Sequence, residues 1–248
     1  MSGRHHYLAA FALLLLPCQG IAQGGDTLST LGCMLEPSKK VEVSSPVPGV
    51  LAVLEVRRGD QVVVGDTLFQ LRAGVERAAV ELARVRADFA RRDAERNEEL
   101  YADDLLSVHE RDEIETDLLL ARMELRLAEE ELALRTVSSP ISGVVVDRLL
   151  DEGEYVNVDP VLRLATLNPL HIDLLLPSEY FGEISVGQVL EIIAAPALPE
   201  AREATVSTVD PLIDPASGTF RVQLTMSNPG NSIPAGLRCS ARLPASVD

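Results

Sequence analysis

The sequence predicts a mixed α and β fold, in which two β-rich segments are separated by an antiparallel pair of long helices and followed by a small β-barrel. Three observations predict it. A β-rich pattern occurs twice, 94 residues apart. A charged segment with heptad spacing lies between the two copies. From residue 168 onward, short strands alternate with turns rich in Gly and Pro.

The first 22 of the 248 residues are typical of a secretory signal peptide. Arg4 precedes an apolar run over residues 7–16, and Ala22 supplies the small residue before the expected cleavage point. Cys18 follows a Leu-rich run, as in lipoprotein signals, but Pro17 directly before it departs from that pattern, so a lipid anchor at Cys18 is not expected. No other apolar stretch approaches the roughly 20 residues that a membrane helix needs. The sequence therefore predicts an exported protein.

The composition argues against several classes of function. The formal net charge is −16, whereas nucleic-acid binding requires a basic face, so no nucleic-acid partner is expected. After the signal peptide, the only histidines, His109 and His171, are isolated, and no metal site is expected. No nucleophile–base–acid set stands out, so no catalytic residue is assigned and the chain is not expected to be an enzyme. An exported enzyme stays a remote alternative, and the paired carboxylates among the 38 acidic residues carry no weight for it.

The repeat predicts two interlocking halves of one flattened sandwich, over residues 41–73 and 137–167. Each copy places a Gly-Val pair after a Pro, then a Gly in an acidic turn, then a β-branched strand. The matched pairs are Pro46 and Pro140, Gly49 and Gly143, Gly59 and Gly153, Val62 and Val156, Val64 and Val158, and Leu68 and Leu162. Gly59 and Gly153 are expected to take a positive φ, which only Gly adopts at little cost.

Residues 74–136, between the two copies, predict an antiparallel α-helical hairpin. Apolar residues recur at heptad spacing on both arms and are expected to form one coiled-coil seam. They are Val75, Ala78, Leu82, Val85 and Phe89 on the first arm, and Ile114, Leu118, Ala121, Leu125, Ala128 and Leu132 on the second. Ser107, three residues before Glu110, forms a capping box that starts the second helix. A seam of only two helices has little core of its own, which favours an oligomer.

The Pro-x-x-Gly-Val and Gly-acidic-x-Val pieces of the repeat resemble the lipoyl/biotinyl domain family in its barrel-sandwich hybrid form. A cofactor carrier of that family needs a Lys on the hairpin between the two halves, for amide linkage of the cofactor. The only lysines here, Lys39 and Lys40, lie ahead of the first half. No cofactor is therefore expected, and a lipoyl or biotin carrier stays a remote alternative.

The middle of the helical segment resembles the hairpin tip of periplasmic adaptors (membrane fusion proteins, HlyD-like) of the resistance–nodulation–division (RND) type. In that family an Arg, a Leu four residues later and a Ser eleven residues after the Arg mark the end that meets a TolC-type outer-membrane channel. Arg96, Leu100 and Ser107 have this spacing, and the resemblance implies that they bind the channel. Each also has a simpler interpretation, as a surface charge, a last core residue and an N-cap.

Residues 168–248 predict a small closed or nearly closed β-barrel. Strands are expected over 170–176, 187–193, 204–209, 219–226 and 237–243, with a short helix from 177 that Ser178 caps. The stretch Asp214-Pro-Ala-Ser-Gly-Thr-Phe-Arg-Val222 resembles the β-barrel domain of the adaptor family. Larger family members continue into a membrane-proximal domain, which is not expected here. A segment over residues 23–40 precedes the first half, and hinges are expected near 71–74 and 167–169.

Two cysteines remain after the signal peptide, Cys33 and Cys239. An exported compartment permits a disulfide between them, and two buried thiols are the alternative.

The resemblance as a whole implies a periplasmic adaptor subunit, peripherally associated with the inner membrane. It would link an inner-membrane pump, with the RND type favoured, to a TolC-type channel, and would form a homo-oligomer of six copies. An adaptor of an ABC-type exporter or secretion system is the alternative, and the exported substrate is not identified.

Overall fold

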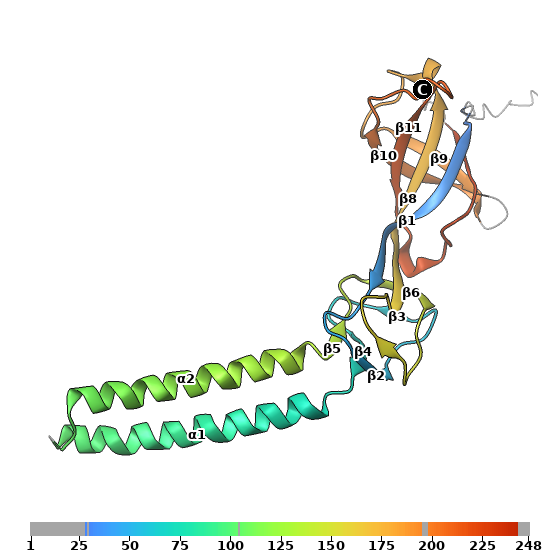
Figure 1. Cartoon of the computed structure of the whole chain (residues 1–248). Coiled ribbons are helices and arrows are strands. Elements are labelled where there is room, and N and C mark those ends of the chain that lie inside the picture. Colours follow the sequence, from blue (N-terminus) through green and yellow to red (C-terminus); the bar gives the residue numbers. More distant parts are fainter. Residues whose placement is uncertain (1–27, 29, 104, 195–197, 243–248) are drawn as a thin grey trace, which may run out of the picture.

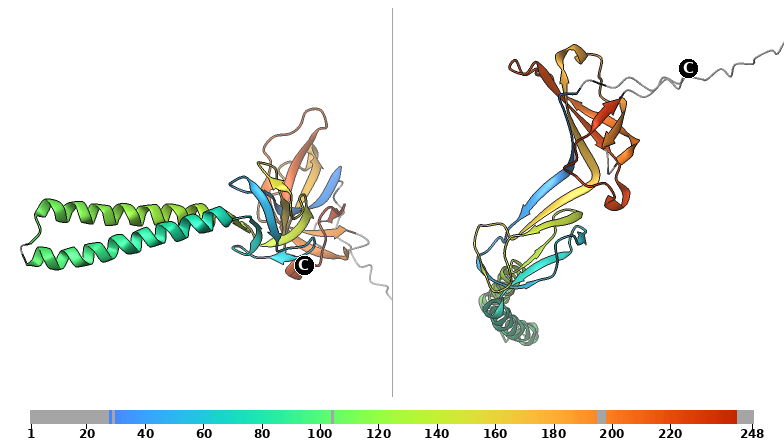
Figure 2. Two further views of the ribbon diagram at one scale, coloured as in Figure 1. Left: turned by 60° about the horizontal axis from the view of Figure 1, so that its bottom comes forward. Right: turned by 90° about the vertical axis from the view of Figure 1, so that its right-hand side faces the viewer.

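The computed structural model describes residues 28, 30–103, 105–194 and 198–242, and these form three bodies in a row (Figure 1). A two-helix hairpin projects sideways from a small β-sandwich, and a larger β-sheet domain continues on the other side of the sandwich. The right-hand view of Figure 2 shows the same order, with the hairpin seen end-on and well away from the sheet domain. The expected signal peptide and Cys18 lie outside the described residues.

The sandwich is built from both copies of the repeat, as the sequence predicts. Strands of the first copy pair with strands of the second, β2 with β7 and β3 with β6, so neither half can form its sheets alone. One sheet has the order β5-β4-β2-β7, and β3 and β6 extend the other sheet, which β8 joins. The strands are β2 (Gly49–Leu54), β3 (Gln61–Val62), β4 (Thr67–Leu71), β5 (Thr136–Ser138), β6 (Gly143–Arg148) and β7 (Tyr155–Val156). Fully buried Leu68, Phe69, Val156 and Leu162 fill the core between them.

The glycines shared by the two copies meet different structural needs. Gly59 and Gly153 take φ values of 93° and 94°, as expected for their turns. Gly143 faces strand β8 so closely that a Cβ there would collide with the carbonyl oxygen of Ala165. At Gly49 a Cβ would lie 2.8 Å from a guanidinium nitrogen of Arg135. Glycine is therefore needed for backbone conformation at Gly59 and Gly153, and for close packing at Gly49 and Gly143.

The hairpin consists of α1 (Gly74–Ala102) and α2 (Val108–Ala133), which pack against each other along their length. Ser107 caps α2 as predicted, because its hydroxyl accepts a hydrogen bond from the Glu110 backbone N–H and the Glu110 carboxylate accepts one from the Ser107 N–H. On α2, the predicted seam residues are buried or half-buried against α1. The burial of these residues agrees with the side of α2 on which the seam is predicted.

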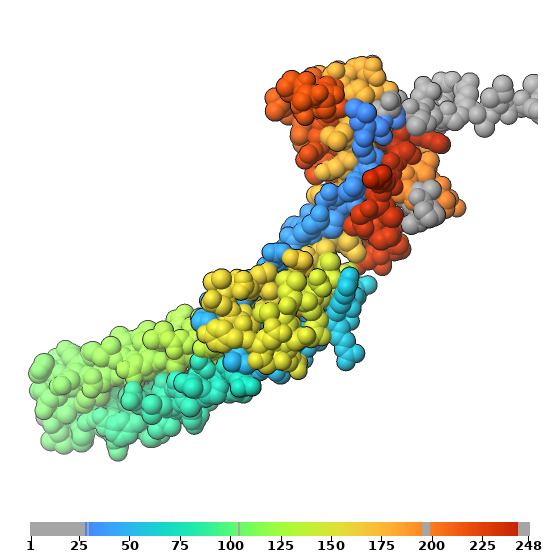
Figure 3. Space-filling model, turned by 45° about the vertical axis from the view of Figure 1, so that its right-hand side comes forward, coloured from blue at the N-terminus to red at the C-terminus, as the bar shows by residue number. Residues whose placement is uncertain are grey.

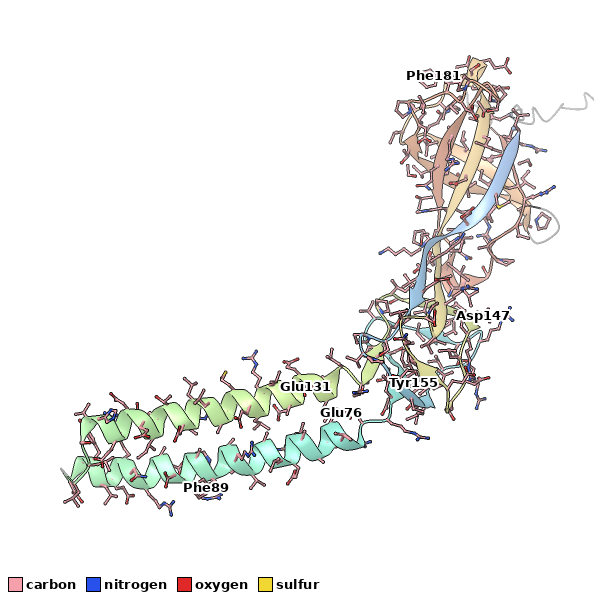
Figure 4. All side chains as sticks on the ribbon, viewed as in Figure 1. Glu76, Phe89, Glu131, Asp147, Tyr155 and Phe181 are labelled. Carbon is pink, nitrogen blue, oxygen red and sulfur yellow. A yellow bond between two sulfur atoms is a disulfide. The ribbon has the colours of Figure 1, made fainter. Side chains whose placement is uncertain are left out.

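The seam predicted for the first arm is wrong. Val75, Leu82, Val85 and Phe89 are exposed, and Figure 4 shows Phe89 on the side of α1 away from α2. The residues that face α2 are smaller: Val80, Ala83 and Ala87 are buried, and Ala90 and Ala94 are half-buried. The physical reason lies in α2, whose seam carries Leu at every second position. Large residues there require small residues opposite them for the two helices to approach closely.

The C-terminal domain is one sheet in the order β9-β10-β11-β8, with β1 on the far side of β8 and β12 beside β9. Its strands are β1 (Gly32–Val43), β8 (Leu162–Pro177), β9 (Val189–Ala194), β10 (Leu198–Val209), β11 (Thr219–Met226) and β12 (Ser240–Arg242). The core contains Leu35, Leu170, Ile172, Leu190 and Phe220, all buried. Backbone hydrogen bonds also join the segment before β12 to the free edge of β1, at Leu35 and at Cys33.

Several expectations for this domain need correction. Residues 178–180 form a short 3₁₀ helix, η1 (Ser178–Tyr180), which has Pro177 at its N-cap position and no side-chain cap, so Ser178 is not a cap. A second one, η2 (Pro229–Asn231), follows β11. The strand expected over 237–243 is limited to β12 among its described residues. β8 begins at Leu162 and crosses the expected boundary at residue 168 without a break.

Strands β1 and β8 belong to both the sandwich and the sheet domain. They form an antiparallel pair from Gly32 opposite Leu175 to Val43 opposite Leu162, and Figure 3 shows β1, in blue, crossing the narrow waist between the two bodies. Asn228, fully buried, braces this waist: its amide donates to the carbonyls of Leu167 and Ile233, and its side-chain oxygen accepts from the Ile233 N–H. The segment 167–169 is thereby hydrogen-bonded in place.

Cys33 in β1 and Cys239 just before β12 are joined by a disulfide, with their Cα atoms 4.9 Å apart. The bond links the first strand of the sheet domain to its last described segment, which are 206 residues apart in sequence. In the part of the chain that the structure describes, no helix is long and apolar enough to cross a membrane.

Candidate partner-binding site at the hairpin tip

The three residues that the sequence singled out lie where α1 ends and α2 begins, and this end of the hairpin is the one farthest from the two β-bodies (Figure 1). Arg96 is in the last two turns of α1, with its side chain 68% exposed and its guanidinium 3.0 Å from the Asp93 carboxylate. Leu100 is exposed one turn later, and Ser107 starts α2. The fold therefore brings all three to one end of the molecule.

The turn between the helices is held by local hydrogen bonds. The Leu105 N–H donates to the Leu100 carbonyl at 2.9 Å, and the Ser107 hydroxyl donates to the Glu110 carboxylate at 2.6 Å while also accepting from the Glu110 N–H. These bonds from Ser107 lower the pKa of Glu110, because they stabilise its ionised form. The Ser107 hydroxyl is thus engaged in the cap, and a role in binding a partner stays a prediction.

A second set of contacts ties the end of α1 to the beginning of α2. The Arg111 guanidinium lies over the Tyr101 ring, 4.6 Å from its centroid, and pairs with Glu98 at 3.1 Å and Glu115 at 3.0 Å. The two carboxylates raise the pKa of Arg111, with Glu115 contributing most. The tip is therefore an ordered frame that can present side chains in fixed positions.

Two apolar residues that the sequence analysis did not select are more exposed at the tip than Leu100. Leu105 is 72% exposed and Val108 is 61% exposed. Leu105 follows two aspartates in the segment interpreted only as a break between helices, so its apolar character was overlooked. A Leu in a turn, where no core can cover it, is the signal that could have identified it.

The tip combines an apolar surface of Leu100, Leu105 and Val108 with the charged side chains of Arg96 and its neighbours. Such a surface can bury apolar area against another protein and form hydrogen bonds at its rim, which is the usual composition of a contact patch. It holds no group of three potential metal ligands, nor does any other part of the described chain. The arrangement suits a protein contact rather than a reaction.

Comparison with known proteins identifies the family to which this architecture belongs. A family model described as "RND MFP, barrel-sandwich hybrid domain" matches residues 39–167, more than half of the chain. The chain belongs to the RND membrane fusion protein family. Proteins of this family are non-catalytic linkers, in agreement with the expectation that the chain is not an enzyme.

Individual members of the family are distant relatives. The efflux pump periplasmic linker BepD of Brucella suis is 24% identical over 229 residues, which cover 80% of this chain and 58% of BepD. The multidrug efflux pump subunit AcrA of Escherichia coli is 22% identical over 266 residues, covering 89% of this chain and 67% of AcrA.

Among solved structures, a MacA-MexA chimeric protein that contains the Pseudomonas aeruginosa MexA α-hairpin domain superposes with a TM-score of 0.75 at 20% identity. The match covers 88% of this chain and 79% of the chimera. The chain spans about three fifths of the length of several curated relatives that it matches.

Proposed function

We propose that this protein is a periplasmic adaptor subunit that links an inner-membrane efflux pump, of the RND type, to a TolC-type outer-membrane channel. The observation that carries the proposal is the long two-helix hairpin, which projects from a barrel-sandwich hybrid of the RND membrane fusion family and ends in an exposed apolar tip. Relatives named as efflux pump linkers support the same function. The proposal includes export by residues 1–22 and a position at the periplasmic face of the inner membrane.

We infer a division into a segment over 23–40, sandwich halves over 41–73 and 137–167, a hairpin over 74–136 and a small β-barrel over 168–248. Closure of the barrel is supported by the segment from Gly236 to Arg242, which bonds to β1 along one edge and to β9 along the other. A barrel with no free edge strand would resist unwanted pairing with other chains.

The outer faces of the hairpin support a homo-oligomer. Large apolar side chains seven residues apart line the face of each helix that points away from the shared seam. They are Val75, Leu82 and Phe89 on α1, Leu120 and Leu127 on α2, and Leu134 directly after α2, all exposed. Because α1 turns Ala inward and larger residues outward, its outer stripe has more apolar surface to bury than its inner one. A second hairpin packed alongside would cover it, as in a coiled coil.

The heights of the two outer stripes indicate how such copies would pack. The cross-hairpin pair Arg84–Glu129 marks one level of the hairpin. Leu82 lies two residues before Arg84 and Leu127 two residues before Glu129, so each is offset from this level by about 3 Å at 1.5 Å per residue. Because the helices are antiparallel, the offsets run in opposite directions, and the two leucines differ in height by about 6 Å. A neighbour related by rotation alone would set the Leu82 of one copy near the Leu127 of the next. Such a head-to-tail contact closes into a ring, and the family resemblance suggests six copies.

The tip contact is tested in cells that lack the natural gene and carry a plasmid copy. A panel of dyes, antibiotics and metal salts first identifies a compound to which the deletion strain is sensitive. Leu100→Ser combined with Leu105→Ser should then abolish protection, whereas Val64→Ser, at an exposed apolar residue of the sandwich, should not. Full protection by the tip variant, at a normal periplasmic level, would show that the tip does not contact the channel. Co-purification of an ATP-driven permease in place of an RND pump would favour the ABC-exporter alternative.

The ring is tested by the mass of the assembly formed by a chain that begins at residue 23. Leu82→Lys and Leu127→Glu should each reduce assembly, because each places an unpaired charge in an apolar contact. The double variant should recover it, since the introduced ammonium of one copy would then meet the introduced carboxylate of the next. Arg92→Glu, at an exposed site on α1, is the control for a change of charge alone. A double variant no better than the single variants would exclude this contact.

A further inference from the structure

One arginine side chain bridges the joint between the hairpin and the sandwich. Arg135 lies two residues past the end of α2, and its guanidinium pairs with Glu76 in the first turn of α1 at 2.6 Å. A second nitrogen of the same guanidinium donates to the Pro48 carbonyl, 2.9 Å away, in the loop before β2. A single side chain therefore contacts the base of both helices and the first half of the sandwich.

This ion pair differs from the others in its burial. The side chains of Arg135 and Glu76 are 22% and 18% exposed, whereas every other ion pair between described residues has a partner at least half exposed, or both partners more than one third exposed. The Nε of Arg135 is buried as well, without a hydrogen-bond partner in the protein. A buried ion pair is weak evidence for stability, and in some proteins such a pair fixes geometry instead. Because the Arg135–Glu76 pair lies at the joint, its role is to orient the hairpin relative to the sandwich.

The surrounding chain is fitted to the guanidinium. Gly49 has no side chain at the point where a Cβ would come within 2.8 Å of Arg135 Nη1. On the other side, the Leu71 N–H donates to the Arg135 carbonyl at 2.8 Å. The backbone of Arg135 thus holds Leu71, the first residue of the hinge expected at 71–74. The side chain of Arg135 holds Glu76, two residues beyond that hinge. A hollow of 290 Å³ beside Leu71 and Arg135 leaves room for the helices to pivot once the clamp formed by these contacts is released.

We infer that Arg135 is a positioning residue, which holds the hairpin in one direction relative to the sandwich, so that the hinge at 71–74 moves only when the guanidinium leaves Glu76 and Pro48. The clamp is a property of the chain itself. Its consequence, that the hairpin transmits motion of the pump to the channel without changing its direction relative to the sandwich, rests on the proposed function.

The direction of the hairpin is measured with two nitroxide-bearing non-natural amino acids, at Arg92 on α1 and at Val158 on the sandwich, both exposed. This labelling leaves the disulfide untouched, and an excess of unlabelled chain suppresses distances between copies. Pulsed electron paramagnetic resonance should give one narrow distance distribution for the parent chain. With Arg135→Met, which keeps much of the length of the side chain and removes both contacts, the distribution should at least double in width.

Two further variants separate positioning from folding. Arg84→Met removes the exposed pair with Glu129 within the hairpin and should leave the distribution unchanged. Arg135→Lys, which keeps the charge but cannot reach Glu76 and Pro48 together, should give an intermediate width. Equal widths for the parent chain and Arg135→Met, at equal helix content by circular dichroism, would overturn the inference.

A loss of helix content in Arg135→Met would move the test to Arg135→Lys; an unchanged width there, at parental helix content, would overturn the inference equally. The export assay applied to the same variants tests the consequence separately. Broadened distances with full export would leave the clamp in place and refute its role in coupling.

Discussion

Loss of the Cys33–Cys239 disulfide is expected to destabilise the sheet domain strongly. The two cysteines are 206 residues apart, and the loop-entropy relation gives about 5.4 kcal/mol for a loop of that length in a fully unfolded chain. If the sandwich stays folded, the pairing of β1 with β8 shortens the effective loop to roughly 80 residues, which gives about 4.5 kcal/mol. Both limits are similar because the entropy depends only on the logarithm of loop length. With a urea dependence of about 2 kcal/mol/M, the midpoint should fall by about 2 M.

The assay is a urea titration of the chain from residue 23, with and without reductant, read by pulsed hydrogen exchange of peptides from β11. Alkylation and intact mass must show two free thiols in the reduced sample. Cys33→Ser combined with Cys239→Ser should unfold at the midpoint of the reduced parent chain and should not respond to reductant. A midpoint shift below about 0.5 M on complete reduction would refute the reasoning, because it corresponds to only about 1 kcal/mol.

Three further predictions concern single residues. Gly143→Ala is expected to lower the free energy of unfolding by about 3 kcal/mol in thermal denaturation, since its Cβ would meet the backbone of β8, whereas Gly49→Ala should cost less because a side chain can give way. Asn228→Ala should cost about 3 kcal/mol in urea titrations, because it leaves buried carbonyls and an N–H of the waist without partners. Ser107→Ala should raise the pKa of Glu110, measured by NMR titration. In the parent chain that pKa is lowered from 4.5, so the cap stabilises α2 above this pH, and the protection factors of amides in its first turn should fall as the pH is lowered from 4.5 through the folded-state pKa.

The β-sandwich and the existence of the hairpin could be predicted from the sequence because each depends on local signals. The 94-residue spacing fixes which strands correspond, and the turns at Gly59 and Gly153 have the φ values that their residue type predicts. Ser107 marks the beginning of α2 by a hydrogen bond with Glu110, three residues later, and this bond needs no tertiary contact. The gapless match between the copies therefore predicted the sandwich and the position of the hairpin between its halves.

The face of α1 that meets α2 could not be predicted in the same way. Both the Val75–Leu82–Phe89 stripe and the stripe of Val80, Ala83 and Ala87 have helical spacing, and ranking by hydrophobicity selects the larger residues. The choice depends on α2, whose leucines need small residues opposite, and this is information from another helix. The clamp at Arg135 was missed for a related reason, since it depends on how distant segments meet.

The paired strands β1 and β8 have a mechanical consequence. Because their pairing continues through the waist on both sides of a register shift between Pro37 and Lys39, a pull along the long axis of the two β-bodies loads the hydrogen bonds from Gly32 to Val43 in shear. Bonds loaded together share the force, whereas bonds loaded one after another at a frayed end break in sequence. A torque on the sheet domain would likewise reach the sandwich as a twist of one continuous ribbon. The two bodies should then behave as a single lever arm, which leaves the base of the hairpin as the natural pivot.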